Sequence, residues 1–161
     1  MDPNSRWPII AIRIAAVIVM IATVASLWNF MLWLPWQADC GIATAAAFAF
    51  DREALTLSLE GLQLAADAAL DPLERLFFYL PLEHAESVEV QDAAVEAFGR
   101  LVSEAPPELR GYCEYCGKFA QQHRDIIAKF GRFPHRNRIL DRESTPAELE
   151  WLASGGANFG Q

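Results

Sequence analysis

The sequence predicts an all-α fold of antiparallel helical hairpins, preceded by one hydrophobic N-terminal helix. Apolar residues recur at helical spacing from Phe50 onward. Residues typical of helix starts occur at Asp71, Ser87 and Thr145. No convincing pair of strands and no glycine-rich phosphate loop interrupts this pattern. We therefore expect helices that pack against each other in pairs.

Two helices are predicted on either side of Asp71. The apolar face of the first consists of Leu55, Leu59, Leu62 and Ala66, although residues 55–59 also alternate as a strand would. Asp71 followed by Pro72 predicts the start of the second helix, because aspartate caps a helix and proline fits its first turn. We expect this helix to bury Leu73, Phe77 and Leu80, and we expect Pro81 to end or kink it.

Three further helices are predicted after Ser87. Ser87 is the expected cap of a helix that buries Val90, Ala94, Phe98, Leu101 and Val102. Pro106 and Pro107 separate it from the longest helix, which we expect from about Glu108 to Phe130, with Gly131 as its stop. The segment Thr145-Pro146-Ala147-Glu148 is a capping box, so a last helix begins there and ends at Gly155-Gly156.

Residues 1–43 form an apolar leader. Residues 14–34 carry no charge, and as a helix these 21 residues would span the hydrocarbon core of roughly 30 Å. Trp28, Trp33 and Trp36 gather at one end, as at a membrane interface, and Arg6 and Arg13 precede the segment. We expect a single-pass membrane protein with a cytoplasmic N-terminus. A cleaved signal peptide and a buried core helix are the alternatives, and the protein is cytoplasmic if the leader is no functional span.

Residues 44–161 form a separate acidic α-helical domain. The whole formal net charge of −8 falls on residues 51–161. This acidity argues against nucleic acid as a partner, because such binding needs a broad basic surface. Three cysteines are also too few for the disulfide framework of a small secreted fold.

Cys113 and Cys116 form a C-x-x-C pair within the longest predicted helix, and His123 lies on the same face. Structural zinc needs four ligands, usually from two segments. A thioredoxin-type pair would instead begin a helix after a strand. We therefore interpret both cysteines as core residues and expect no metal and no cofactor.

Two charged segments are candidates for a functional site. Residues 129–138 carry four basic residues and no acid within an acidic domain, and the arginine forks of Arg132 and Arg136 suit a carboxylate or phosphate. Their alternative role is to pair with nearby acids such as Glu86. The second segment holds Glu83 and His84 before the helix capped by Ser87. With His123, these residues are candidates for acid/base chemistry, unless His123 is a hydrogen-bonded core histidine.

Several stretches resemble the bacterial family called domain of unknown function 924. They are PLEHAESVEVQ (Pro81–Gln91), HRDIIAKFGRFPHRNRIL (His123–Leu140), RESTPAELEWL (Arg142–Leu152) and AFAFDREAL (Ala47–Leu55). The resemblance implies a tetratricopeptide-like helical fold and no established activity. The site it implies consists of Glu83, His84, Gln91, His123, Arg132, His135, Arg136 and Asn137.

The match to this family is incomplete at the N-terminal side. Family members begin with an aromatic "DFWF"-like helix and carry an "LDQFPRN"-like segment, and the apolar leader occupies that place here. A truncated, inactive family member is therefore one hypothesis. The leading one is a module that binds an anionic small molecule or acidic peptide through Arg132, Arg136 and Asn137. Its rival is a small hydrolase-like enzyme that uses His84, Glu83 and His123.

Overall fold

The computed structural model describes residues 48–157, which fold into helices and no strand. The α-helices are α2 (Asp51–Gln63), α3 (Pro72–Glu83), α4 (Val88–Glu104), α5 (Pro107–Phe130) and α6 (Pro146–Ala153), with 3₁₀ turns η2 (Ala66–Ala69) and η3 (Pro134–Arg136). The all-α prediction is confirmed. The predicted hydrophobic N-terminal helix lies outside the described residues.

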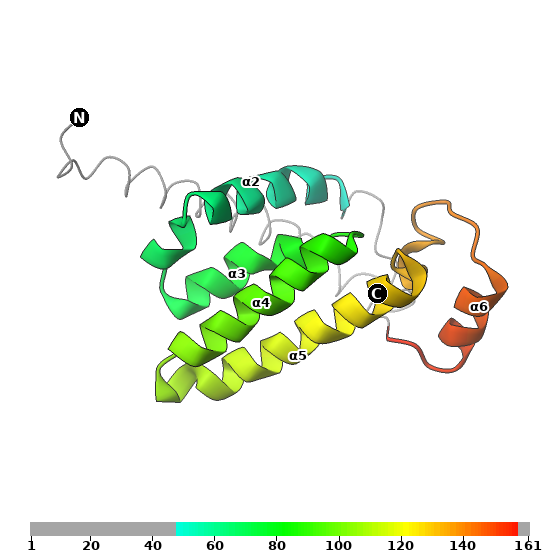
Figure 1. The fold of residues 1–161 in the computed structure, drawn as a ribbon. Coiled ribbons are helices and arrows are strands. Elements are labelled where there is room, and N and C mark those ends of the chain that lie inside the picture. The colour runs from blue at the N-terminus through cyan, green and yellow to red at the C-terminus, as the bar shows by residue number, and fades with distance from the viewer. Residues whose placement is uncertain (1–47, 158–161) are drawn as a thin grey trace, which may run out of the picture.

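The helices α3, α4 and α5 lie side by side, α2 runs along one side of them, and α6 stands beyond the end of α5 (Figure 1). Only Ala105 and Pro106 separate α4 from α5. Such a short connection makes the two helices antiparallel neighbours. The chain after α5 then folds back past the start of α4, which brings residues 131–142 to one end of the bundle.

Local capping sets most helix boundaries where the sequence predicts them. The Asp71 carboxylate accepts hydrogen bonds from the N–H groups of Leu73 and Glu74 at 2.9 and 3.0 Å. Glu148 and Thr145 form the predicted reciprocal box at the start of α6. α5 ends at Gly131 with φ 71°, a left-handed conformation that glycine adopts without a steric penalty. These signals act over a few residues, so the sequence reveals them directly.

The predicted buried face of α3 is wrong. Leu73 is 44% exposed, whereas Leu76, Tyr79 and Leu82 on another face are buried. Both sets have helical spacing, so periodicity alone does not choose between them. Pro81 lies inside the helix, which continues to Glu83. Pro81 forfeits one backbone hydrogen bond, yet its ring is buried and the helix end packs against its neighbours.

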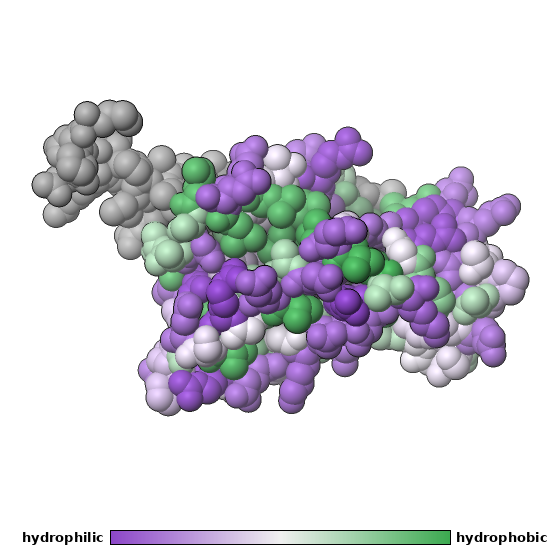
Figure 2. Space-filling model, in the orientation of Figure 1, coloured by the Kyte–Doolittle hydropathy of each residue, from purple (hydrophilic) through white to green (hydrophobic). Residues whose placement is uncertain are grey.

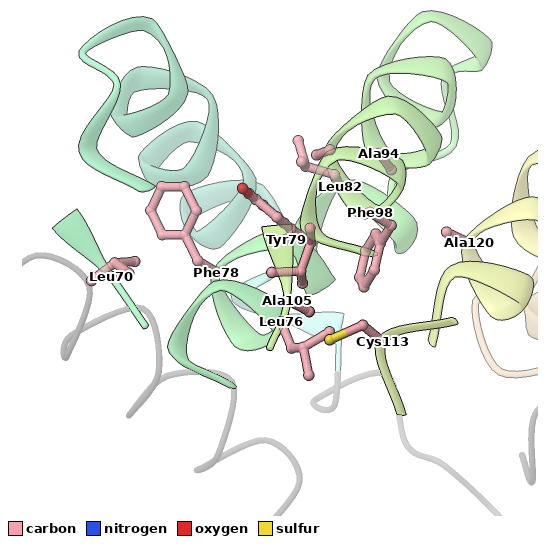
Figure 3. Packing of buried hydrophobic residues seen from close by; sticks show 12 residues of the cluster. Leu70, Leu76, Phe78, Tyr79, Leu82, Ala94, Phe98, Ala105, Cys113 and Ala120 are labelled. Carbon is pink, nitrogen blue, oxygen red and sulfur yellow. The ribbon is translucent and has the colours of Figure 1, made fainter. Parts of the chain in front are cut away.

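The main core lies between α3, α4 and α5. Tyr79 and Phe98 meet edge to face with ring centroids 5.6 Å apart, and Leu82 and Cys113 lie close by (Figure 3). Cys113 and Cys116 are free thiols that pack in this cluster, as predicted. On the face seen in Figure 2, hydrophilic residues predominate over α4 and α5, and apolar residues gather between α2 and α4.

A buried polar network joins η2 to α3 inside this core. The Tyr79 hydroxyl donates to Asp67 Oδ2 at 2.6 Å and accepts from Arg75 Nε at 3.0 Å. Burial, followed by the hydrogen bond to Asp67, raises the pKa of Tyr79 to about 12. The hydroxyl therefore stays protonated and satisfies two buried polar groups at once.

Candidate functional site

The candidate site begins with the connection between α3 and α4, which one α4 side chain holds in place. Glu83 ends α3 and is 3% exposed. The fully buried amide of Gln91 donates to the backbone carbonyls of Glu83 and Ala85 at 2.6 and 2.8 Å. These bonds satisfy two carbonyls at the end of α3 that have no helical donor. Gln91 therefore holds the backbone of Glu83 and His84 in position.

Glu86 ties this connection to the loop after α5. Its carboxylate accepts from the Phe133 N–H at 2.8 Å and from both terminal nitrogens of Arg142 at 2.6 and 2.9 Å. The Arg142 guanidinium lowers the pKa of Glu86, although burial opposes this. The sequence suggests Glu86 as an ion-pair partner for the arginines of residues 129–138. In the structure, Glu86 pairs instead with Arg142.

Arg132 and Asn137 both contact an acid of α6, Glu148. Arg132 donates to the two carboxylate oxygens of Glu148 at 2.7 and 2.8 Å. Asn137 donates to Ser144 Oγ at 3.0 Å and to Glu148 at 3.3 Å. The hydrogen bonds from Arg132 are the main cause that lowers the pKa of Glu148 to about 2. Arg132 and Asn137, which the sequence assigns to a ligand, therefore donate hydrogen bonds to protein groups in this structure.

Arg136 has a different environment. It is 4% exposed, and its guanidinium lies against the rings of Phe48 and Phe133, with centroid distances of 4.7 and 4.5 Å. Its Nη1 donates to the His84 carbonyl at 3.2 Å and approaches Asp51 Oδ2 at 3.6 Å. Burial lowers the pKa of Arg136, and Asp51 opposes this effect. Arg136 remains a cation at neutral pH because its ordinary pKa is far higher.

Several buried polar atoms without a hydrogen-bond partner lie where the connection between α3 and α4 meets residues 131–142, which we call the junction. Within residues 48–157 they include the donors Arg136 Nε and Arg142 Nε and the acceptors Gln91 Oε1 and Asn137 Oδ1. Nearly all buried polar atoms in folded proteins have such a partner, so each exception needs an explanation. A bound ligand or ordered water with both donors and acceptors would supply the missing partners.

Glu83, His84 and His123 converge at the same end of the bundle. The rings of His84 and His123 lie 6.2 Å apart, and Glu83 Oε2 is 3.7 Å from His123 Nδ1. His123 Nδ1 lies 2.8 Å from the Phe119 carbonyl, which can only accept, so we assign the ring hydrogen to Nδ1. The three residues named as acid/base candidates are thus neighbours.

Burial keeps this cluster uncharged at neutral pH. It raises the pKa of Glu83 to about 8 and lowers the pKa of His123 and of His135 to about 4. Burial and the Arg136 charge also lower the pKa of His84. At pH 7 the site therefore combines a protonated carboxyl group and neutral imidazoles with the cation of Arg136. Such a site favours one anionic group, and its carboxyl group suits a general acid.

The sequence does not reveal Asp51, Phe48 or Glu148 as partners of the basic loop, residues 129–138. From the sequence, Glu148 is only the last residue of a capping box, and Asp51 is only an acid in the first turn of a helix. Their contacts with residues 132–137 depend on how the chain folds back. No local pattern encodes them. Within the described range 48–157, no group of three or more histidine, cysteine, aspartate or glutamate side chains is arranged to hold a metal ion.

A family model described as "Bacterial protein of unknown function (DUF924)" matches residues 41–156. The chain belongs to this family. The DUF924 match includes the segments that carry Gln91, His123 and Arg136. A search of curated proteins gives no significant match.

One solved structure is similar to this chain. That structure is a protein of unknown function, ATU0120, from Agrobacterium tumefaciens. It is 33% identical to this chain, with a TM-score of 0.60. The match covers 90% of this chain and 76% of the Agrobacterium chain. The fold of this chain therefore also occurs in another protein of unknown function, and neither the family description nor that name states a ligand or a reaction.

The predicted membrane segment, residues 14–34, lies outside the described residues. Among residues 48–157, no helix is both long and apolar enough to cross a membrane. A membrane anchor at residues 14–34 stays a prediction from the sequence. Retention of the full chain in a membrane pellet after an alkaline wash is the measurement that checks it.

Proposed function

We propose that this DUF924 chain is a helical module that binds a small anionic ligand at Arg136. The observation that carries the proposal is the burial of Arg136, together with the lack of a hydrogen-bond partner for its Nε among residues 48–157. A buried guanidinium is costly unless its donors are bonded. An anion with two acceptor oxygens would satisfy Nε and offset the charge, because guanidinium binds such groups through parallel hydrogen bonds.

In this proposal, fewer residues of the basic loop contact the ligand than the sequence predicts. Arg132 and Asn137 donate to Glu148, so their role in this proposal is to hold the loop. Gln91 and His135 stay in the candidate set. Both lie near Arg136, and Gln91 Oε1 has no hydrogen-bond partner within the described part of the chain. The 4% exposure of Arg136 favours a small anion, or a single carboxylate of an acidic peptide, over a broad acidic surface.

The test uses the full chain with acetate and inorganic phosphate as probes. The Nε–H signal of Arg136 in a ¹H–¹⁵N NMR spectrum is expected to shift on saturation with an anion, and the melting temperature is expected to rise with anion concentration. Arg136→Gln removes the charge and should abolish the rise in melting temperature. Arg100→Gln is the matched control, because Arg100 is exposed and pairs only along its own helix with Glu96.

Three outcomes are informative. An unchanged melting response in Arg136→Gln would place the anion elsewhere on the protein. If that variant does not fold, Arg136→Lys retains the charge but lacks Nε, and it should weaken the response. If the Nε–H signal of wild-type Arg136 does not move with either anion, the binding proposal is wrong. Poorly cooperative unfolding of the same chain would then favour a truncated, inactive family member.

An acid/base enzyme is the second candidate, favoured by the contact between Glu83 and His123. A carboxyl group that stays protonated at pH 7 is suited to general acid catalysis, and His84 lies beside the same imidazole. A ¹³C NMR titration of the Glu83 carboxyl group tests this role. A pKa near the ordinary value of 4.5 would end this alternative, and the measurement does not depend on anion binding.

A further inference from the structure

One side of α2 carries large apolar side chains that remain in contact with water. Phe50, Leu57 and Leu64 are 61%, 37% and 74% exposed, and we call these three residues the outer stripe. They recur every seven residues, which is close to two helical turns, so they lie in one row. The partly exposed Ala54 and Gly61 stand between them. Single exposed apolar residues are common, but a row of this length indicates a contact surface.

The outer stripe is separate from the side of α2 that packs on the core. Leu55, Leu59 and Leu62 pack against the main core. Ser58 on the same side is buried and donates to the Phe78 carbonyl at 2.9 Å. At 3.6 residues per turn, this side lies about 120° around the helix from the outer stripe. α2 is therefore apolar on two sides, and such a helix is expected to be covered on both.

The charges beside the outer stripe limit what can cover it. Glu53 and Glu60 are exposed, and their seven-residue spacing places both along one edge of the stripe. In a two-fold antiparallel pair of α2 helices the same edges meet, so the glutamates of two copies would lie together and repel each other. An anionic membrane surface would be repelled in the same way. The surface therefore suits an apolar segment that carries no negative charge.

We propose that residues 14–34 of this same chain pack along the outer stripe. These residues carry no charge, and a segment that is apolar on every side needs either protein or lipid around it. The basic residues of the leader, Arg6 and Arg13, precede this segment, and their charge suits the acidic edge formed by Glu53 and Glu60. The outer stripe thus competes with the lipid bilayer for the same side chains.

The connection to α2 is long enough for this contact. Residues 35–47 join the segment to the described part of the chain. Thirteen extended residues reach at most about 45 Å, whereas a helix of 13 residues such as α2 is about 20 Å long. A tether of this length keeps the segment at an effective concentration in the millimolar range. The segment of the same chain is therefore favoured over that of a second copy.

Hydrogen–deuterium exchange of the full chain in detergent-free buffer, read by mass spectrometry, tests the contact. Amides of residues 14–34 should exchange at least about tenfold faster in Leu57→Asp and in Leu64→Asp than in wild type, because the burial of one leucine changes a packing equilibrium by this factor or more. Leu149→Asp is the matched control. Leu149 is 56% exposed on α6, which stands beyond the end of α5 (Figure 1), so this variant should exchange like wild type.

Each outcome decides for or against the contact. Protection of residues 14–34 that is lost in both stripe variants and does not depend on protein concentration is the expected result. Equal exchange in wild type and the stripe variants would overturn the proposal. Protection that grows with protein concentration would assign the stripe to a second copy. A full chain that stays in solution only with lipid or detergent would favour the membrane anchor.

The amides of α4 and α5 report in the same experiment whether each variant is folded. If an aspartate variant unfolds, Leu64→Ala takes its place, since it shortens a side chain that is 74% exposed and adds no charge. It should still speed the exchange of residues 14–34, by a smaller factor than Leu64→Asp. Exchange of residues 14–34 that is unchanged in a folded Leu64→Ala variant would refute the contact.

Discussion

Replacement of Glu148 by glutamine tests whether Arg132 and Asn137 hold the loop or are available to a ligand. Glu148 is 2% exposed and accepts hydrogen bonds from Arg132, Asn137 and the Thr145 N–H. Glutamine has nearly the same shape but no charge, and its amide nitrogen would face other donors. The variant Glu148→Gln should therefore lose stability without a change in core packing.

The structure sets the size of this loss. The pKa of Glu148 falls from 4.5 to about 2, and at about 1.4 kcal/mol for each pH unit this difference gives an upper limit of about 3 kcal/mol. Arg132 is the main cause, and its side chain is 28% exposed, so water weakens the interaction. We expect Glu148→Gln to lower the free energy of unfolding by about 2 kcal/mol at neutral pH.

The pH dependence has a definite sign. A carboxyl group whose pKa is lower in the folded state stabilises the fold above its unfolded pKa of 4.5, and this contribution is lost as the pH falls from 4.5 towards 2. The difference between wild type and Glu148→Gln should therefore be full at neutral pH and shrink over that range.

Urea unfolding of the full chain, followed by far-UV circular dichroism, measures this difference. Glu150→Gln is the control, because Glu150 is exposed on the same helix and should change stability by less than about 0.5 kcal/mol. Equal unfolding free energies for the two variants would refute the reasoning. Arg132 and Asn137 would then return as ligand donors, as the sequence alone predicts.

Two further predictions concern buried titratable groups. Because the pKa of Glu83 is raised to about 8 in the folded state, wild type should lose stability as the pH rises from 4.5 to 8. Urea unfolding across this pH range should show that Glu83→Gln lacks this loss. Parallel pH profiles for the two proteins would contradict the prediction. Tyr79→Phe should cost about 2 kcal/mol in the same assay, because Asp67 and Arg75 lose their buried partner. A loss below about 0.5 kcal/mol would mean that water replaces the hydroxyl.

The sequence predicts the helix boundaries because their causes are local. Asp71, Thr145 and Gly131 act through hydrogen bonds or backbone conformation within a few residues. The buried faces of α4 and α5 also follow from the sequence, since each of these helices has one dominant apolar stripe. α3 is different, because Leu73 and Leu76 belong to two competing apolar faces. Packing against α4 and α5 selects one of them.

The candidate site is only partly predictable for the same reason. Its residue types stand out in the sequence, since arginines cluster in an acidic domain and His84 directly follows Glu83. The roles of the arginines depend on tertiary neighbours: Arg132 meets Glu148 after the loop folds back, and Arg136 meets Asp51, which lies 85 positions earlier in the chain. Composition thus determines that cations are present here, and only the folded chain decides which acids and aromatic rings surround each of them.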